Sequence, residues 1–226
     1  MLNPNIERKL DMVLQELDVF QNAIEISPQP ILPIDFVLAK KYLNSFPQHS
    51  VKAVGLQNGQ SEYILSPTCC YPVFKHFEGK KFLNDVLITN KSNCFRNEKE
   101  YIEGTRQFCF KMREYILFSR DLPKVKRWIE EVKLQIQAAL ASLGIEIAVE
   151  KATDPFFNPR DFQQVMQSTE NLKSEFLHCG ISLGSINMHL KAFSKSCSMV
   201  DENGNHIYTA CFGLGYDRVA HFIGVK

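Results

Sequence analysis

The chain has 226 residues, which is enough for a single domain with a substantial core, and we expect one domain over residues 1–226. Hydrophobic residues make up 45% and charged residues 23%, an ordinary globular composition, and the formal net charge is +1. This small charge counts mildly against a nucleic-acid partner, because proteins that grip phosphates usually carry a basic surplus. No run reaches the roughly 18 apolar residues of a membrane span, and charges interrupt residues 1–20, unlike a secretory signal. We therefore expect a cytoplasmic protein.

The cysteines favour free thiols over disulfides. There are seven of them, an odd number, in a chain that is not small and shows no secretory signal. No two of them have Cys-x-x-Cys spacing, so a zinc ribbon is excluded. Most would serve as buried apolar side chains. A metal site would have to draw its ligands from distant parts of the chain.

The N-terminal part is predicted to begin with an amphipathic helix over residues 5–24, where apolar residues recur at helical spacing until a proline-containing run ends it. A shorter helix fits Phe36–Leu43. Apolar residues 51–56 and 63–65 flank the dipeptide Asn58-Gly59, and this arrangement predicts a hairpin.

The middle of the chain alternates short strands with one long strand and one long helix. Residues 85–89 and 93–96 are short strand candidates, and residues 106–117 form the clearest long strand. Residues 122–142 have the apolar spacing of a helix, and Gly144 follows as its C-terminal cap.

The next predicted elements are a strand, a helix and a strand pair. Residues 145–149 fit a strand and residues 162–168 fit a helix. Residues 171–178 and 181–190 fit two strands that pair around Gly180.

The chain is predicted to end with a turn, a strand and a helix. Asn203-Gly204 marks the turn, residues 207–212 the strand, and residues 213–222 the helix, opened by glycines. Strand-rich segments flanked by helices predict an α+β domain on a mainly antiparallel sheet.

A first block of charged and aromatic residues lies around the long predicted strand. It begins with Phe95-Arg96-Asn97-Glu98, and strand alternation then brings Arg106, Phe110 and Glu114 onto one face. A cation, a flat ring and an acid in line can receive a triphosphate, an adenine ring and a third group. Arginine suits phosphate because its planar fork binds oxygens bidentately. An ordinary half-buried strand with a peripheral salt bridge would show the same pattern.

A second block follows near the C-terminus. Gly213 and Gly215 would let the backbone approach a ligand closely, and Arg218 would lie on the first turn of a helix. By itself, Gly-x-Gly-x-x-Arg could equally be a tight strand-to-helix turn.

Taken in order, Phe-Arg-x-Glu, Arg-x-x-x-Phe-x-x-x-Glu and Gly-x-Gly-x-x-Arg resemble motifs 2 and 3 of class II aminoacyl-tRNA synthetases. The resemblance implies that Arg96 holds the α-phosphate of ATP and the carboxylate of an amino acid. Glu98 would meet the adenine amino group, and Arg106 and Arg218 the outer phosphates. Phe110 and Arg218 would stack on the two faces of adenine. Arginines and Mg²⁺ suit the charge that develops during adenylate formation, but of the acids near this motif only Asp217 is a candidate Mg²⁺ ligand.

Further segments are similar to amino acid:[carrier protein] ligases, which are relatives of the catalytic core of methanogen-type seryl-tRNA synthetases. These segments are Ser66–Pro72, Arg113–Tyr115, Ala152–Phe157, Ser185–His189, Thr209–Cys211 and Tyr42–Pro47.

The family resemblance implies a zinc ion that binds the amino group of the substrate. The matching ligands are Cys70, Glu114 and Cys211, and three ligands with one open position are typical of a functional zinc site. Cys70 is preferred over Cys69 because the family's cysteine precedes Tyr-Pro. Buried filler is the alternative for Cys70 alone. His189 either lines the pocket or is structural.

The resemblance also implies a holo carrier protein as partner, whose phosphopantetheine thiol accepts a small amino acid such as glycine or alanine. Arg160 and the helix after it would dock this acidic carrier, unless Arg160 is simply a solvated surface residue. A homodimer through the first helix and the Pro-rich strand after it is expected. We expect no tRNA partner, because the chain has no room for an anticodon-binding domain. Two alternatives remain, namely a seryl-type tRNA-charging enzyme and a non-enzymatic paralogue that binds amino acid or ATP.

Overall fold

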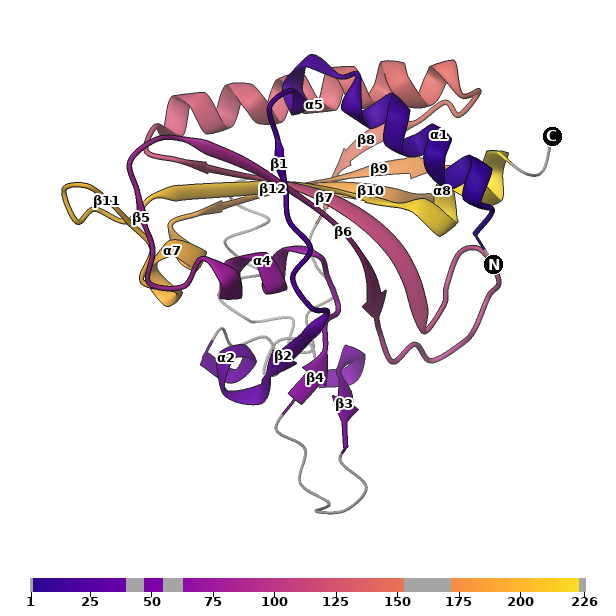
Figure 1. Ribbon diagram of the computed structural model, residues 1–226. Coiled ribbons are helices and arrows are strands. Elements are labelled where there is room, and N and C mark those ends of the chain that lie inside the picture. Colours follow the sequence, from indigo (N-terminus) through magenta and orange to yellow (C-terminus); the bar gives the residue numbers. More distant parts are fainter. Residues whose placement is uncertain (1, 40–46, 55–62, 153–171, 224–226) are drawn as a thin grey trace.

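A seven-stranded sheet organises the molecule (Figure 1), in the strand order β1-β6-β7-β12-β10-β9-β8. This computed structural model describes residues 2–39, 47–54, 63–152 and 172–223. In that order the strands are β1 (Ile24–Glu25), β6 (Val86–Phe95), β7 (Cys109–Ser119), β12 (Tyr208–Gly215), β10 (Ile181–Leu190), β9 (Lys173–His178) and β8 (Ala148–Lys151). All neighbours pair antiparallel except β1 and β6, which are parallel. The predicted α+β class with a mainly antiparallel sheet is confirmed.

Helices lie on both sides of this sheet (Figure 1). The helices are α1 (Pro4–Gln15), α2 (Ile34–Ala39), α4 (Cys70–His76), α5 (Leu122–Ser142), α7 (Ala192–Ser196) and α8 (Tyr216–Ile223). Apolar side chains of α1, α5 and α8 pack on the sheet in one hydrophobic cluster. Those of α2 and α4 join a second cluster on the opposite side. None of the described helices has both the length and the apolarity that crossing a bilayer requires.

Smaller elements lie outside the seven-stranded sheet. They are a three-stranded sheet of β2 (Ile31–Pro33), β4 (Tyr63–Leu65) and β3 (Val51–Ala53), a pair of β5 (Lys81–Phe82) and β11 (Val200–Asp201), and the 3₁₀ helices Asp18–Phe20 and Pro47–His49. The antiparallel pairing of β3 with β4 confirms the predicted hairpin strands, while the expected turn between them lies outside the described residues. The predicted helix Phe36–Leu43 is confirmed over its described part by α2, while its residues 40–43 and the predicted helix at 162–168 lie outside the described residues.

The first helix is shorter than predicted, because it ends at Gln15 and not at residue 24. The chain then turns through a 3₁₀ helix, and Asn22 has a φ of 63°. This turn brings Phe20 into the core, where its ring stacks on Tyr115 at 3.7 Å between centroids. The indole Nε1 of Trp128 donates to the carbonyl of Val19 at 3.2 Å. Apolar residues after Gln15 thus reach the core from a turn and not from a continued helix.

Three further strand predictions are corrected. The two short strands at 85–89 and 93–96 are one continuous strand, β6. The long strand begins at Cys109, so Arg106 precedes it, in a bridge with Ile102. The segment 213–215 is the end of β12 and does not open the last helix. The long helix over 122–142 and the strand pair β9–β10 are confirmed.

Candidate active site

A cavity of about 1060 Å³ lies against β7, β10 and β12. Eight of the nine predicted site residues line it: Cys70, Arg96, Glu98, Arg106, Phe110, Glu114, Cys211 and Arg218. The ninth, Arg160, lies outside the described residues. Residues up to 148 positions apart in the sequence (Cys70 to Arg218) therefore meet in one chamber.

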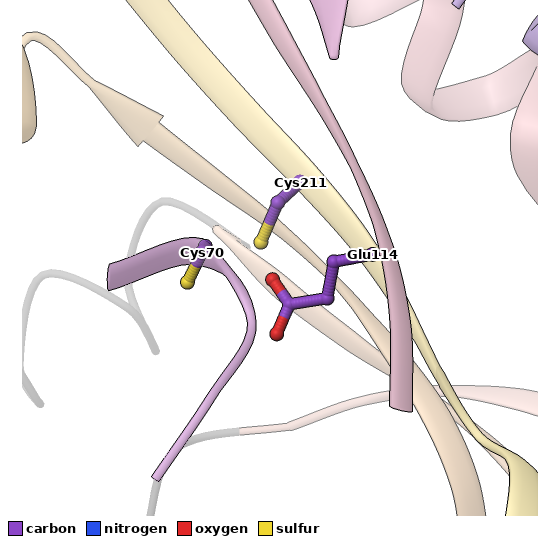
Figure 2. Close-up of side chains that lie close together, drawn as sticks. All are labelled: Cys70, Glu114 and Cys211. Atoms are coloured by element: carbon purple, nitrogen blue, oxygen red, sulfur yellow. The ribbon is translucent and has the colours of Figure 1, made fainter. Parts of the chain in front are cut away.

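Three potential metal ligands among the residues that line this cavity lie close together (Figure 2). One ligand atom each from Cys70, Glu114 and Cys211 lie within 4.8 Å of one another. Glu114 on β7 is paired with Gly213 on β12, so Cys211, two residues along, projects from the same face of the sheet. Cys70 is the first residue of α4 and approaches from that helix. All three side chains are buried.

The Glu114 carboxylate has one oxygen satisfied and one without a partner. Its Oε1 accepts from the backbone N–H of Cys69 at 3.0 Å, whereas Oε2 is buried without a hydrogen-bond partner. Burial, together with the neighbouring Cys211 thiolate, raises the pKa of Glu114 well above its ordinary value. A buried carboxyl oxygen without a donor fits a site that a cation completes. Two thiols and a carboxylate are a donor set that suits zinc.

The two thiols of the group are not equivalent. The nearby Cys211 sulfur and burial raise the pKa of Cys70, whereas the nearby Cys70 thiol lowers the pKa of Cys211 against the effect of burial. The Nε2 of His189, 3.5 Å from the Cys211 sulfur, also lowers the pKa of Cys211. Ionised thiols are the form that binds metals, and the lowered pKa of Cys211 favours that form.

Cys69 points away from this group, in line with the preference for Cys70. Its sulfur lies 3.6 Å from the Cys94 sulfur and 3.3 Å from the carbonyl oxygen of Met112. The amide of Asn90, a residue of β6 paired with Glu114, donates to the Cys69 carbonyl at 2.9 Å. These contacts hold the segment before α4, so that Cys70 alone turns toward the cavity.

Two arginines converge on the same cavity from different elements. Arg96 follows β6, donates from Nε to the Pro67 carbonyl at 3.1 Å, and has its guanidinium 5.0 Å from the centre of the Phe110 ring. Arg218, in the first turn of α8, donates to the carbonyls of Thr105 and Ser182 at 2.8 and 2.6 Å. Burial and the nearby charge of Arg96 lower the pKa of Arg218. Two cations held close together in a partly desolvated chamber suit an anionic ligand.

Arg106 lies in the loop before β7, which departs from the predicted common face with Phe110 and Glu114. The loop turns at Gly104, where φ is 77°, before the strand begins at Cys109. The Arg106 side chain still borders the cavity and pairs with Glu98 at 4.0 Å. It is half exposed, so this ion pair contributes little by itself.

The acids that line the described part of the cavity provide no ready-made magnesium site. Asp217, the Mg²⁺ candidate from the sequence, accepts from the backbone N–H of Lys111 at 2.6 Å and so anchors β7 to α8. Glu175 pairs with Lys173 at 2.9 Å, Glu98 pairs with Arg106, and Glu114 belongs to the group of potential zinc ligands. Magnesium usually binds through one or two carboxylates plus substrate phosphates, and the described residues single out no such carboxylate.

Sequence reasoning missed two lysines of the cavity wall. Lys191 and Lys195 border the cavity around α7, with Phe193 between them. Lys195 is exposed, and the Lys191 ammonium lies 4.7 Å from the centre of the Tyr208 ring. Their four-residue spacing was the available signal, although such spacing is common on helix surfaces. His189 lines the cavity, as the first of its two predicted alternatives proposed.

The sequence is similar to one curated ligase. No family model matches the sequence. The chain is 29% identical over 170 residues to "Amino acid--[acyl-carrier-protein] ligase 1" of Bradyrhizobium diazoefficiens, an alignment that covers 71% of this chain and 51% of that protein. The chain thus spans about half the length of this curated relative.

Solved structures of synthetases match nearly the whole chain. The M. kandleri seryl-tRNA synthetase, solved with A. aeolicus tRNASec, has a TM-score of 0.81 at 16% identity, covering 96% of this chain and 50% of that one. The cytoplasmic serine-tRNA ligase of Naegleria fowleri, in complex with AMP, gives 0.74 at 16% identity, covering 97% and 54%. The prolyl-tRNA synthetase of Cryptosporidium parvum gives 0.73 at 11% identity, covering 96% and 44%. The chain therefore has the class II aminoacyl-tRNA synthetase fold, and its predicted resemblance to amino acid:[carrier protein] ligases is confirmed.

Proposed function

We propose that this protein is a ligase that activates a small amino acid with ATP and transfers it to the phosphopantetheine thiol of a carrier protein in the cytoplasm. The observation that carries the proposal is the single cavity shared by the ATP-motif residues and the buried Cys70, Glu114 and Cys211 group. The similarity to a protein named as an amino acid–[acyl-carrier-protein] ligase supports the same reaction.

In the first half-reaction a carboxylate oxygen of the amino acid attacks the α-phosphorus of ATP, and pyrophosphate leaves. Arg96 and Arg218 are suited to stabilise the negative charge that develops there, because both border the same cavity and are held by backbone carbonyls. The Phe110 ring offers a face for adenine, with Glu98 as acceptor for its amino group, and Arg106 assists with the outer phosphates. Mg²⁺ would enter with ATP.

The substrate amino group is the second recognition element in this proposal. Cys70, Glu114 and Cys211 would hold a zinc ion, which when bound supplies a Lewis acid for the α-amino group. The unpartnered Oε2 of Glu114 supports this ligand set. Compounds without an α-amino group would bind poorly.

In the second half-reaction the phosphopantetheine sulfur attacks the carbonyl carbon of the adenylate, and AMP leaves. Lys191 and Lys195 support the approach of an acidic carrier, because they border the cavity and no acidic side chain pairs with them among the described residues. Arg160, outside the described residues, is a further proposed docking residue for the same carrier.

The decisive experiment offers one labelled amino acid, ATP and enzyme to holo carrier, apo carrier and total tRNA in separate reactions. A screen of pyrophosphate exchange across all amino acids first identifies the substrate. Label on the holo carrier alone supports the proposal. Label on tRNA alone would replace it with tRNA charging, which the similarity to seryl-tRNA synthetase structures also favours. Absence of both exchange and transfer would indicate a non-enzymatic binding paralogue.

We further propose that the protein is a homodimer in which α1 and the segment after it contact the partner. The edge strand β1 carries Ile24, and α1 carries Met12, both with more than half of their surface exposed. Apolar side chains at an unpaired sheet edge suit burial against a second copy. Light scattering of the wild type and of Ile24→Glu tests this, and a monomeric wild type would contradict it.

A further inference from the structure

We propose that His189 is a positioning residue of the metal centre, and that it orients the Cys211 sulfur by a hydrogen bond from Nε2. The inference rests on the proposed function, because it assigns a partner to one of the three zinc ligands proposed there. His189 borders the cavity, yet among the described residues the group of close ligand atoms consists of Cys70, Glu114 and Cys211 only. Its role is therefore to act on a ligand.

The backbone of β10 is irregular at this position. Met188 pairs with Ala210 on β12. Leu190 pairs with Thr209, so His189 is the extra residue of a β-bulge. Leu190 itself has a φ of 51°, in the left-handed region that residues other than glycine seldom adopt. A bulge with a strained neighbour re-aims a side chain, and here it aims the imidazole at the next strand.

The imidazole connects two residues of β12. Its Nδ1 lies 3.1 Å from the Thr209 hydroxyl oxygen, and its Nε2 lies 3.5 Å from the Cys211 sulfur. A metal-bound thiolate can only accept a hydrogen bond, so Nε2 must carry the proton. With a neutral ring, Nδ1 is then the acceptor, and the Thr209 hydroxyl donates to it. The fully buried Thr209 therefore fixes the tautomer that serves Cys211.

Two aromatic rings fix the plane of the imidazole. His189 and Phe193 pack edge to face, with 4.8 Å between ring centroids and an interplanar angle of 78°. Phe74 of α4 approaches in the same way at 5.7 Å. These contacts restrict rotation of the ring, so that the Nε2–H direction toward Cys211 is maintained. Loss of such an outer partner typically weakens metal binding about 10–100-fold.

Zinc affinity by chelator competition tests the role without any need for turnover. His189→Leu removes the donor and should weaken zinc binding about 10–100-fold. His189→Gln retains an N–H donor and should recover most of the affinity. His76→Leu is the matched control, since His76 is exposed on α4 and does not border the cavity. It should bind zinc as the wild type does.

Cobalt substitution distinguishes a positioning residue from a metal ligand. In His189→Leu the thiolate-to-cobalt charge-transfer band should move to longer wavelength, because the sulfur electrons lose a stabilising hydrogen bond. The ligand-field bands should keep the wild-type pattern, because the number of ligands is unchanged. Ligand-field bands that report a lost ligand would make His189 a ligand and overturn the proposal.

Unchanged zinc affinity together with an unshifted charge-transfer band in His189→Leu would also overturn it. If His189→Leu does not fold, Thr209→Val provides the test. This variant keeps the imidazole but removes the hydroxyl that fixes which ring nitrogen carries the proton. A weaker zinc complex is expected there, with Thr209→Ser restoring it, and wild-type affinity in Thr209→Val would refute the role. If zinc affinity is unchanged in all these variants, only the role of His189 is refuted and the proposed function stands. If the wild type binds no zinc, the proposed metal centre is refuted as well.

Discussion

Glu114 and Cys211 show at the scale of single residues how a buried polar group can require a ligand. Glu114 keeps one oxygen without a hydrogen-bond partner, next to two thiols that are also buried. Replacing one protein ligand of such a group should remove most of its metal affinity, because three donors are the minimum for a stable site with one open position.

The wild type should therefore carry about one zinc per chain, and Cys211→Ala should lose it. Elemental analysis of freshly purified, unchelated protein measures this. Cys109→Ala is the control, because Cys109 is exposed and lies outside the group. Wild-type protein without zinc, or full zinc content in Cys211→Ala, would contradict the assignment.

The arginines make a second prediction at this scale. Arg96→Ala and Arg218→Ala should each lower amino-acid-dependent pyrophosphate exchange about 10²–10³-fold, which is roughly 3–4 kcal/mol of transition-state stabilisation. Arg127→Ala, an exposed change on α5, should exchange at the wild-type rate. Circular dichroism confirms that the variants fold. Wild-type exchange rates in both variants would rule out the proposed role in activation.

At the scale of elements, a cluster of charged residues attaches helix α1 to the strands beneath it. Asp11 accepts hydrogen bonds from Lys91 at 2.6 Å, Tyr216 at 2.7 Å and Arg113 at 3.1 Å. Burial raises the pKa of Asp11, but the hydrogen bonds from Lys91 and Tyr216 and the charge of Arg113 outweigh it, so the pKa lies below its ordinary value. Arg113 is almost fully buried, so Asp11 compensates a charge that water does not reach.

The pH dependence of this cluster follows from the lowered pKa. The contribution of Asp11 to the free energy of unfolding should be complete above its unfolded-state pKa and disappear as the pH falls through the lower folded-state value. Asp11→Asn should cost about 2 kcal/mol at neutral pH, less than a fully buried pair, because Glu25 also pairs with Arg113. Urea unfolding across the acid range measures the difference. A difference independent of pH would contradict this account, and Glu130→Gln, in an exposed pair on α5, is the control.

The short helix α7 gives a prediction about docking. Lys195→Glu should raise the KM for the holo carrier severalfold while pyrophosphate exchange stays unchanged, because the lysine is exposed at the cavity border. The effect should weaken as salt rises, since exposed charges are screened. Arg160→Glu should behave in the same way.

Lys126→Glu provides a matched charge reversal on α5, across the sheet from α7 (Figure 1). Equal effects of Lys195→Glu and Lys126→Glu would indicate a response to net charge and not a docking surface.

For the molecule as a whole, local patterns predicted the elements better than the turns between them. Residues 122–142 have both an apolar stripe and a glycine at the end, so that helix was predictable to the residue. Spacing around Phe20 mimics a helix, although the chain turns there to reach the core. The face shared by Phe110 and Glu114 followed from alternation, but the start of β7 depends on a loop that alternation does not encode. The orientation of His189 toward Cys211 depends on a β-bulge. A bulge arises from pairing between strands, so the sequence of either strand alone does not predict it.

The separation of the two hydrophobic clusters by the sheet has a thermodynamic consequence. Cys70 and Cys211 are members of the cluster on the α4 side, whereas α5 packs on the other side. A bound cation would therefore stabilise the α4 side of the sheet locally. Its removal should favour local unfolding on that side without unfolding the α5 side. Hydrogen–deuterium exchange should show α4 amides exchanging faster after chelation, while α5 amides keep their protection. Equal acceleration in both helices would mean that the two layers open as one cooperative unit. If only the α4 amides exchange faster, loss of the metal opens the α4 side of the cavity. The layer that contains α5 then stays folded, so the protein can bind metal again without refolding.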